Sequence, residues 1–265
     1  MPSPATYLDR ILAAHREAAA ADDRPLDALA ATAAAAPAVR GFAAAVRRHD
    51  GIAVIAEIKR RSPSKGDLDP SLDPATVAAD YERGGAACMS VLTDAAFFGG
   101  SRADLEAARA ACSLPVLRKD FTVAPADVYD ARSMGADAVL LIAAALSDDE
   151  LARLHALVVS LGMDALVEVH DEAELARALA VDATLIGVNQ RDLVTFAVDT
   201  ERAVRLASSF PAHVTAIAES GIDGPPAAAR LADAGYRGVL VGETLMRSPD
   251  RASAVAGLRA AVVRA

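Results

Sequence analysis

The feature that most limits how this chain can fold is a series of eight short, almost wholly apolar segments. Each one follows a stretch of helical character that ends at glycine or another small residue. Short strands that are apolar throughout are typical of a parallel sheet covered on both faces. The sequence therefore predicts parallel strands at residues 52–58, 88–92, 116–119, 138–142, 165–169, 184–188, 214–218 and 238–241.

Eight strand–helix units in 265 residues are the pattern of a (β/α)8 barrel, the TIM-barrel fold of the α/β class. A doubly wound open sheet is the alternative, but it needs fewer strands, and no GxGxxG sequence follows the first predicted strand. Residues 5 to about 48 show helical spacing of apolar residues, interrupted by Pro25 and Pro37. We therefore predict a single domain over residues 1–265. Residues 1–50 form an N-terminal helical extension that packs over one end of a barrel built from residues 51–265.

Polar residues stand where the predicted strands end. In a (β/α)8 barrel these ends meet at the face that carries the active site. Packing alone does not favour charged groups at such positions. We therefore predict a site in which the residues at these strand ends converge: Glu57, Lys59, Thr93, Lys119, Ile142, Glu168, Asn189, Glu219, Ser220 and Gly242.

The first strand end continues into a basic loop. Residues two apart in a strand point to the same side, so Glu57 and Lys59 lie together, and a turn-rich loop with Arg60 and Lys65 follows. The whole chain is acidic, with a formal net charge of −9, which disfavours nucleic acid or an anionic membrane as a partner. A basic cluster on this background indicates a site for a small anion. For Arg60 or Lys65 taken singly, exposure to solvent is the alternative.

Lys119 and Glu168 are the candidates for proton transfer. Lys119 lies on the same side of its strand as Leu117, so we expect it to point into the barrel mouth. There a lysine can bind an anion, form a Schiff base or act as a general acid. Simple neutralisation by Asp120 is the alternative. Glu168 can act as a general base, with a structural ion pair as its alternative, and we interpret His170 as a loop residue.

Two glycine-containing turns, Ser220-Gly221 and Gly242-Glu243, follow the last two predicted strands. Barrels of this class often bind phosphate with the backbone N–H groups of the loops after strands seven and eight. We predict a phosphate site there, to which Glu243 contributes only its N–H because its side chain repels anions. Ordinary strand-to-helix turns are the alternative, since glycine is common in any turn.

Other chemistry is disfavoured. Cys88 and Cys112 lie in apolar surroundings without a CxxC pattern, which is typical of reduced thiols in a cytosolic protein. The five histidines are scattered and no HExxH occurs, so we expect no metal. No signal peptide and no apolar run of about 18 residues is present. We therefore expect a cytoplasmic protein that contacts no membrane and no nucleic acid.

Eight segments, taken in order, resemble the indole-3-glycerol-phosphate synthase family of tryptophan biosynthesis. Together they are specific and cover nearly the whole chain, although AESGI or LVGE alone is a weak signal. They are IAEIKRRSPSKG at 55–66, SVLTDAAFFGGS at 90–101, PVLRKDF at 115–121, GADAVLLI at 135–142, LVEVHDE at 166–172, IGVNQRDL at 186–193, AESGI at 218–222 and VLVGETLMR at 239–247.

The resemblance implies a lyase that closes the indole ring of 1-(2-carboxyphenylamino)-1-deoxyribulose 5-phosphate. The products are indole-3-glycerol phosphate, carbon dioxide and water, and no cofactor is used. Lys119 is implied as the general acid at the substrate carbonyl and Glu168 as the general base of the later dehydration. Lys59 is implied to bind the carboxylate or phosphate, and the N-terminal helices to form part of a lid.

The remaining implied roles concern substrate binding. The positioning residues are Glu57, Ser62, Asn189 and Glu219. The phosphate neighbours are Arg191, Ser220, Gly221, Gly242 and Glu243, and the apolar wall is formed by Phe98, Phe121 and Leu140. Some family members carry serine where this chain has Glu243-Thr244, so Glu243 is expected to bind through its backbone alone.

Two competing functions stay open at this point. A phosphoribosylanthranilate isomerase uses a cysteine and an aspartate as its acid–base pair, but Cys88 begins a strand here and does not end one. A catalytically silent barrel that binds an anionic metabolite is the other alternative, against which the paired placing of Lys119 and Glu168 argues. We expect a monomer that binds a phosphorylated small molecule and associates at most weakly with other enzymes of the tryptophan pathway.

Overall fold

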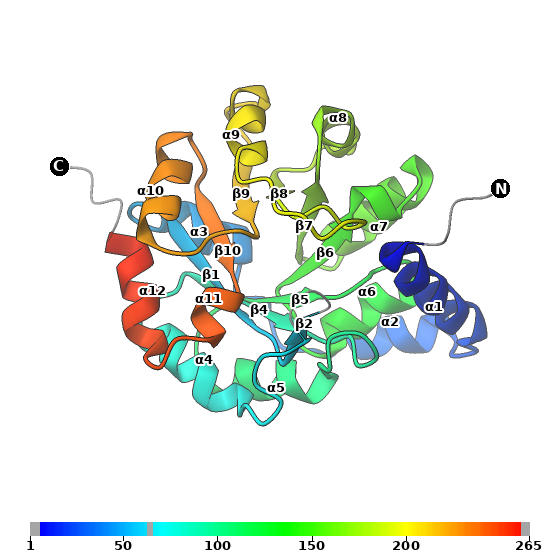
Figure 1. The fold of residues 1–265 in the computed structure, drawn as a ribbon. Coiled ribbons are helices and arrows are strands. Elements are labelled where there is room, and N and C mark those ends of the chain that lie inside the picture. Colours follow the sequence, from blue (N-terminus) through cyan, green and yellow to red (C-terminus); the bar gives the residue numbers. More distant parts are fainter. Residues whose placement is uncertain (1–5, 63–65, 261–265) are drawn as a thin grey trace.

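The structure is a computed structural model that describes residues 6–62 and 66–260. Its parallel strands are β1 (Ala53–Ile58), β4 (Cys88–Leu92), β5 (Val116–Lys119), β6 (Ala138–Ile142), β7 (Asp164–Val169), β8 (Leu185–Asn189), β9 (Thr215–Glu219) and β10 (Gly238–Val241). They close into a barrel in the order β1-β10-β9-β8-β7-β6-β5-β4 (Figure 1). The predicted (β/α)8 barrel is confirmed, and each strand begins and ends within one residue of its predicted bounds.

Closure of the barrel follows from the register of β1. Ile55 of β1 pairs with Leu240 on one side and with Cys88 on the other, so no strand is left at an edge. This pairing excludes the doubly wound open sheet. Every residue of β1 is buried, because one face of the strand fills the barrel interior and the other packs under helices. The strands therefore appear in the sequence as continuous apolar runs.

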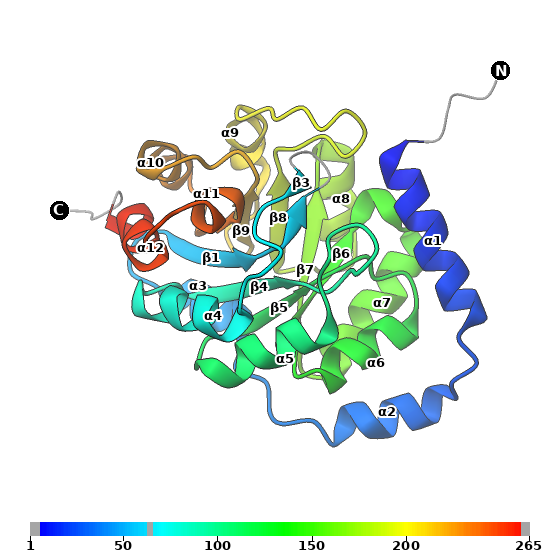
Figure 2. The same cartoon turned by 60° about the horizontal axis from the view of Figure 1, so that its bottom comes forward.

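Helices surround the barrel (Figures 1 and 2). Several begin at a side chain that accepts a backbone N–H of the first turn, as Asp73, Ser101, Ser147 and Asp171 do. The elements are α4 (Pro74–Arg83), α5 (Arg102–Ala111), α6 (Pro125–Ser133), α7 (Asp148–Ser160), α8 (Glu172–Ala180), α9 (Arg202–Leu206), α10 (Pro225–Asp233), α11 (Glu243–Met246) and α12 (Arg251–Ala260), with short 3-10 turns at Ala143–Ala145 and Ala207–Ser209.

The sequence suggested that the N-terminal extension packs over one end of the barrel. In the structure it reaches further than that. Its helices are α1 (Tyr7–Ala21), α2 (Leu26–Ala34) and α3 (Phe42–Arg48). Helix α1 lies beside α7, to which Arg16 is tied by an ion pair of 2.7 Å to Glu150 (Figures 1 and 2). Helix α2 packs against α6. The extension therefore runs along the side of the barrel and reaches both ends, because Pro25 and the segment around Pro37 divide it into separate helices.

Helix α3 closes the amino-terminal end of the barrel. Phe42 and Val46 are fully buried there. The N–H of Ala43 donates to Asp164 at the start of β7 (2.9 Å), and the Cys88 thiol at the start of β4 donates to the carbonyl of Phe42 (3.5 Å). This end of the barrel is therefore filled by apolar side chains and by polar groups whose partners are fixed.

The strand β1 leads into a small hairpin that the sequence did not predict. It pairs β2 (Arg61–Ser62) with β3 (Gly66–Asp67). The guanidinium of Arg61 donates to the carbonyls of Ala96 (2.8 Å) and Phe97 (3.2 Å), which fixes one side of this hairpin. Lys65 of the predicted basic loop lies outside the described residues.

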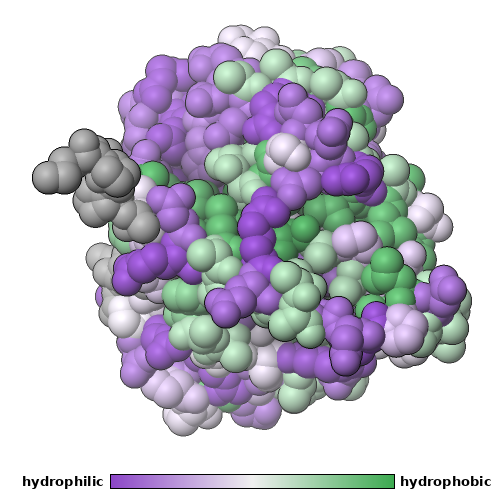
Figure 3. Space-filling model, turned by 90° about the vertical axis from the view of Figure 1, so that its right-hand side faces the viewer, coloured by the Kyte–Doolittle hydropathy of each residue, from purple (hydrophilic) through white to green (hydrophobic). Residues whose placement is uncertain are grey.

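The surface of the side that carries α1 and α2 is mixed in character. Figure 3 shows hydrophobic side chains across the middle of this face, divided by a strip of hydrophilic side chains, with mostly hydrophilic side chains above and a mixture below. Within residues 6–62 and 66–260, every helix is too short or too polar to cross a bilayer.

Candidate active site

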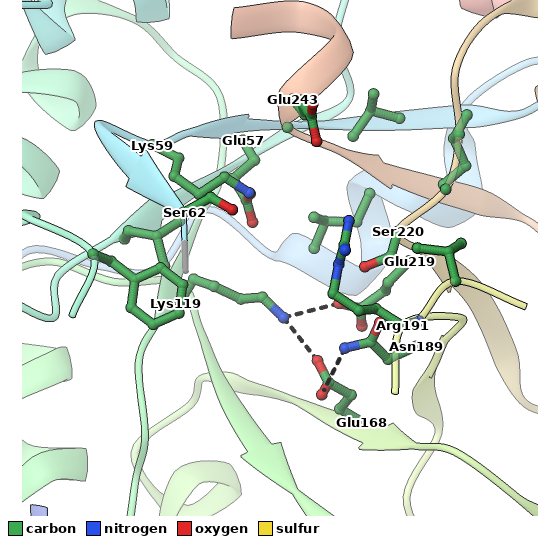
Figure 4. Close-up of a pocket in the computed structure, with 18 of the residues that line it drawn as sticks. Glu57, Lys59, Ser62, Lys119, Glu168, Asn189, Arg191, Glu219, Ser220 and Glu243 are labelled. Carbon is green, nitrogen blue, oxygen red and sulfur yellow. Dashed lines mark hydrogen bonds and ion pairs between the residues drawn. The ribbon is translucent and has the colours of Figure 1, made fainter. Parts of the chain in front are cut away.

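A cavity of about 540 Å³ opens at the carboxyl ends of the strands. Its size is that of a typical small-molecule site. All fifteen residues that the sequence analysis assigned to catalysis or binding line it: Glu57, Lys59, Ser62, Phe98, Lys119, Phe121, Leu140, Glu168, Asn189, Arg191, Glu219, Ser220, Gly221, Gly242 and Glu243 (Figure 4). The strand-end rule therefore located the pocket, because parallel strands bring residues distant in sequence to one face. It was wrong for Thr93, which is not among the lining residues and donates to Asp120 instead.

Lys119 lies at the centre of the site. Its ammonium donates to Glu168 Oε2 at 2.8 Å and to Glu219 Oε2 at 2.9 Å (Figure 4). The neighbouring Arg118 points to the other side of β5, where it pairs with Asp120 at 2.9 Å. Asp120 therefore neutralises Arg118, and the alternative that it neutralises Lys119 is wrong.

The three charges shift one another's pKa. Burial disfavours the Lys119 ammonium, but the carboxylates of Glu168 and Glu219 outweigh burial and raise its pKa well above the usual range. Burial also disfavours the charged form of Glu168, yet Lys119 overcomes this effect and lowers the Glu168 pKa. For Glu219, burial and the charge of Glu168 prevail over Lys119, and its pKa is raised. The two carboxyls are thus chemically different, which is the pattern expected where one acts as a base.

Asn189 orients Glu168. Its side-chain amide donates to Glu168 Oε1 at 3.1 Å, while its carbonyl oxygen accepts the backbone N–H of Arg191 at 3.0 Å. The second contact fixes which end of the amide faces Glu168. Both oxygens of Glu168 are therefore engaged, one by Lys119 and one by Asn189 (Figure 4).

Glycines make room for two of the acidic side chains. A Cβ atom at Gly187 in β8 would collide with the carboxylate of Glu219, and one at Gly242 would collide with that of Glu57 and lie 3.1 Å from Lys59 Nζ. Glu57 and Lys59 form an ion pair of 2.5 Å at the end of β1. The absence of side chains at Gly187 and Gly242 thus allows charged groups to turn inward at these strand ends.

The side chains at the end of β1 and in the basic loop that follows have two different roles. Arg60 turns away from the cavity, where it pairs with Asp104 at 2.8 Å and donates to the carbonyls of Pro70 and Leu72. This arrangement differs from simple exposure, which the sequence left open for Arg60. Ser62 lines the cavity. Arg60 therefore braces the loop, while Lys59 and Ser62 face the site.

The turns after β9 and β10 form another side of the cavity. Ser220 and Gly221 both have positive φ angles, 65° and 70°, so their N–H groups turn in an unusual direction for consecutive residues. A Cβ atom at Gly221 would lie only 2.5 Å from Val198 Cγ1, so this position admits glycine alone without movement. Consecutive amides of this kind can form an anion-binding concavity.

The apolar side of the cavity contains Phe98 and Phe121, whose ring centroids are 6.3 Å apart. Leu140 lines the same cavity from β6. An aromatic ring of a ligand can pack against these side chains without losing hydrogen bonds. The site therefore combines an apolar wall, a charged centre and an anion-binding turn.

Comparison with known proteins identifies the family. The family model described as "Indole-3-glycerol phosphate synthase" matches residues 8–258. The chain belongs to the indole-3-glycerol phosphate synthase family. The Indole-3-glycerol phosphate synthase of Hyphomonas neptunium is 48% identical over 262 residues, which are 97% of this chain and 99% of that protein. That of Mycobacterium ulcerans is 50% identical over 258 residues, which are 97% and 94% of the two chains.

Solved structures support the fold independently. Thiamine phosphate pyrophosphorylase from Pyrococcus furiosus superposes with a TM-score of 0.59 at 15% identity, covering 79% of this chain and 94% of that one. The N-acetylmannosamine-6-phosphate 2-epimerase from Clostridium perfringens gives 0.56 at 15% identity, covering 72% and 86%. At these identities the likeness concerns the fold alone. The family assignment places the chain among lyases of tryptophan biosynthesis.

Family membership fits the placement of the cysteines. Cys88 lies at the start of β4 against the carbonyl of Phe42, at the end of the barrel opposite the site. It cannot serve as an acid in the cavity. Cys88 therefore does not lie where a phosphoribosylanthranilate isomerase would need its acidic cysteine, which argues against that alternative for this indole-3-glycerol phosphate synthase family member.

One group of possible metal ligands was not foreseen from the sequence. His15 of α1 lies 2.9 Å from Asp94 and 3.8 Å from Asp120, both of which are buried. The carboxylate oxygens already accept protein hydrogen bonds: Asp94 from the N–H groups of Phe97 and Phe98, and Asp120 from Arg118, Thr93 and the N–H of Phe121. We call these three residues the His15 brace, because their bonds hold α1 to the rim of the site.

Several lining residues were missed by sequence reasoning. Leu92, Phe196, Val198, Ile222 and Leu240 contribute apolar surface, and Arg247 contributes a cation. Leu92 and Leu240 lie in barrel strands and look like ordinary core in the sequence. Phe196 stands in the loop after β8, where only the fold brings it to the cavity. No local pattern marks such residues, since their role depends on which loops meet above the barrel.

Proposed function

We propose that this protein converts 1-(2-carboxyphenylamino)-1-deoxyribulose 5-phosphate to indole-3-glycerol phosphate, carbon dioxide and water, without a cofactor. The observation that supports this most is the contact of the Lys119 ammonium with two buried carboxylates, at 2.8 Å to Glu168 and 2.9 Å to Glu219. A buried acid beside a buried base is what a ring closure followed by a dehydration requires.

Lys119 is the proposed general acid. Its raised pKa keeps it protonated at neutral pH, so a proton is available when the aromatic ring attacks the substrate carbonyl. Protonation of the carbonyl oxygen removes the negative charge that otherwise builds up in this step. A positioned acid of this kind contributes about 10²- to 10⁴-fold in rate.

Glu168 is the proposed general base of the dehydration. While Lys119 is charged, it lowers the pKa of Glu168 and makes it a weak base. Loss of the Lys119 proton to the substrate removes that charge, so the pKa of Glu168 rises as the second step begins. Asn189 and Glu219 hold the pair in position through their contacts to Glu168 and Lys119.

The substrate groups match the sides of the cavity. We propose that Lys59, which pairs with Glu57, binds the carboxylate or the phosphate and supports proton transfer, while Glu57 and Ser62 position the substrate. The aromatic ring packs on Phe98, Phe121 and Leu140. The phosphate lies among Arg191, Ser220, Gly221, Gly242 and Glu243, where only the backbone of Glu243 faces it. Proximity of the reacting groups in this cavity contributes several kcal/mol more.

Further proposals concern the organisation of the protein. Residues 1–265 form one barrel domain, in which residues 1–50 supply part of a lid. The ring of Tyr7 supports this role, because its centroid lies 5.8 Å from that of Phe97 and 5.3 Å from that of Phe196 at the rim of the site. The free thiols Cys88 and Cys112 are compatible with the reducing cytoplasm. We propose a monomer that binds a phosphorylated small molecule, with weak association with other tryptophan-pathway enzymes at most.

The test is a fluorescence assay for indole-3-glycerol phosphate with purified protein, the carboxyphenylamino-deoxyribulose phosphate and no added metal. We expect turnover by the wild type and its loss in Glu168→Gln, with substrate binding retained. Tight binding without turnover by the wild type would favour a silent barrel. Undiminished turnover in Glu168→Gln would remove Glu168 from the base role while leaving the reaction established.

A further inference from the structure

Glu168 has a second neighbour on the side away from the cavity. His170 follows β7, and its Nε2 lies 3.8 Å from Glu168 Oε1. On its other side, Nδ1 of the same ring lies 3.0 Å from Glu174 Oε2, which also accepts the backbone N–H of His170 at 2.8 Å. Glu174 thus fixes the ring so that Nε2 is directed at Glu168. The interpretation of His170 as an ordinary loop residue from the sequence missed this arrangement.

The Nε2 atom of His170 is buried and, among the described residues, has no hydrogen-bond partner. Glu168 lines the cavity, whereas His170 is not among the lining residues in the part of the chain that the structure describes. The ring therefore stands behind Glu168, seen from the cavity, and reaches the reaction only through it. A buried nitrogen without a partner is costly in a fold, which points to a use in the working enzyme.

The charges around His170 favour its protonated form. Burial disfavours the imidazolium, but the hydrogen bond to Glu174 and the charges of Glu168 and Glu174 outweigh burial and raise the pKa of His170. Arg202, which donates to the carbonyl of Asn189 at 2.9 Å, opposes them. An imidazolium with Nδ1–H bonded to Glu174 presents an Nε2–H bond toward Glu168.

The proposed reaction has a proton requirement that the acid–base pair alone does not meet. The carbonyl oxygen takes up two protons to leave as water, while the carbon chain gives up one proton to Glu168. The substrate carboxylate departs as neutral carbon dioxide, so each turnover consumes one proton from solvent. Glu168 can return its own proton to Lys119 across 2.8 Å. The additional proton has to reach the pair from solvent in each turnover.

We propose that His170 is a positioning residue that delivers this proton to the acid–base pair through Glu168. The Nε2–H bond of the imidazolium breaks as an O–H bond forms on the Glu168 carboxylate. The carboxyl group then turns its protonated oxygen toward neutral Lys119 and passes the proton on, and a hydronium ion from solvent restores the imidazolium. The 3.8 Å gap needs to shorten by about 1 Å to reach hydrogen-bond range. The inference rests on the proposed roles of Lys119 and Glu168.

The experiment compares His170→Ala with His155→Ala, a control on α7, in the fluorescence assay. We expect His170→Ala to lower kcat by about 100-fold, the low end of acid–base effects, with KM nearly unchanged. Added imidazole should restore kcat in a saturable way. Pyrazole has the same shape but stays unprotonated, so it should restore nothing. Neither compound should affect the wild type or His155→Ala.

The pH profile separates proton delivery from a structural role. Delivery needs the imidazolium, so wild-type kcat should fall as pH rises through the raised His170 pKa. In Glu174→Gln the imidazolium loses its carboxylate partner, and this alkaline limb should move to lower pH. His170→Gln, which keeps the bulk of the ring but does not titrate, should lack the limb and stay slow; it also serves if His170→Ala fails to fold.

Four results overturn the inference. Normal kcat and an unchanged alkaline limb in His170→Ala or His170→Gln would show that the proton enters elsewhere. Equal restoration by pyrazole and imidazole would show that the ring only fills space. Full activity of Glu168→Gln would remove Glu168 from both the base role and the delivery route while leaving the reaction established. Absence of wild-type turnover would overturn the proposed function and the delivery route together.

Discussion

The two ends of the barrel differ in how completely their buried carboxylates are paired. At the amino-terminal end, the fully buried Asp137 accepts the N–H groups of Arg40 (2.7 Å) and Val116 (2.8 Å) and pairs with Arg109 at 3.4 Å. At the carboxyl-terminal end, Glu168 and Glu219 share the single ammonium of Lys119, and among the described residues Glu219 Oε1 has no hydrogen-bond partner.

This difference separates a structural use of charge from a chemical one. Around Asp137 the partners are two backbone N–H groups and the guanidinium of Arg109, which itself donates to the carbonyl of Ala38 at 3.2 Å. Around Lys119, one ammonium is shared by two carboxylates, and among the described residues one oxygen of Glu219 has no hydrogen-bond partner. The site therefore keeps hydrogen-bonding capacity for a substrate, at a cost to the stability of the fold.

The largest effect should come from Lys119→Met at the carboxyl-terminal end. Because Lys119 is the proposed acid, we expect kcat to fall by about 10²- to 10⁴-fold while the substrate still binds. The fluorescence assay and a binding titration measure the two quantities. Arg109→Met is the matched change at the other end and should keep kcat per folded molecule. Full activity of Lys119→Met would show that the buried charge at the carboxyl-terminal end is not needed for the reaction.

Asp137→Ala should be the most damaging change to stability. It leaves the buried N–H groups of Arg40 and Val116 and the guanidinium of Arg109 without their acceptor. We expect the free energy of unfolding to fall by about 3–5 kcal/mol, measured by urea denaturation. The activity of the folded fraction should be unchanged. A loss of kcat without loss of stability would contradict a purely structural role for this end.

Glu219→Gln should stabilise the fold and slow the reaction. Burial raises the Glu219 pKa above its ordinary 4.5, so its ionisation weakens the fold as pH rises from about 4.5 through the folded pKa. Removing the charge should therefore raise the free energy of unfolding by about 1 kcal/mol at neutral pH and by less near pH 4. Denaturation at both pH values tests this, and a destabilised variant at neutral pH would refute it.

The smallest effect concerns the His15 brace at the rim of the site. Burial disfavours charged His15, but Asp94 and Asp120 outweigh it and raise the pKa of the ring. The stabilisation is therefore complete below pH 6.5 and is lost as pH rises through the raised pKa. His15→Gln should lower stability by about 0.5–1 kcal/mol in acid and by less in alkali. Equal losses at both pH values would show that the charge of His15 is irrelevant.

Much of the site could be predicted from the sequence because one rule covers it. The strand runs show where the barrel face lies, and polar residues at their ends, such as Lys119 and Glu168, mark the site. The same rule cannot place residues that reach the site from loops, such as Phe196, or from a separate helix, such as His15. Their positions depend on how the loops pack above the barrel, which leaves no periodic signal.

The sequence by itself determined the eight strands, the barrel and the inward-facing polar residues, since alternation and apolar runs are local properties of the chain. Only the tertiary structure decided which charges meet. Lys119 pairs with Glu168 and Glu219, which lie 49 and 100 residues away, and not with the adjacent Asp120. The reason is geometric: side chains of neighbouring residues point to opposite sides of a strand, whereas the ends of separate parallel strands converge on one cavity.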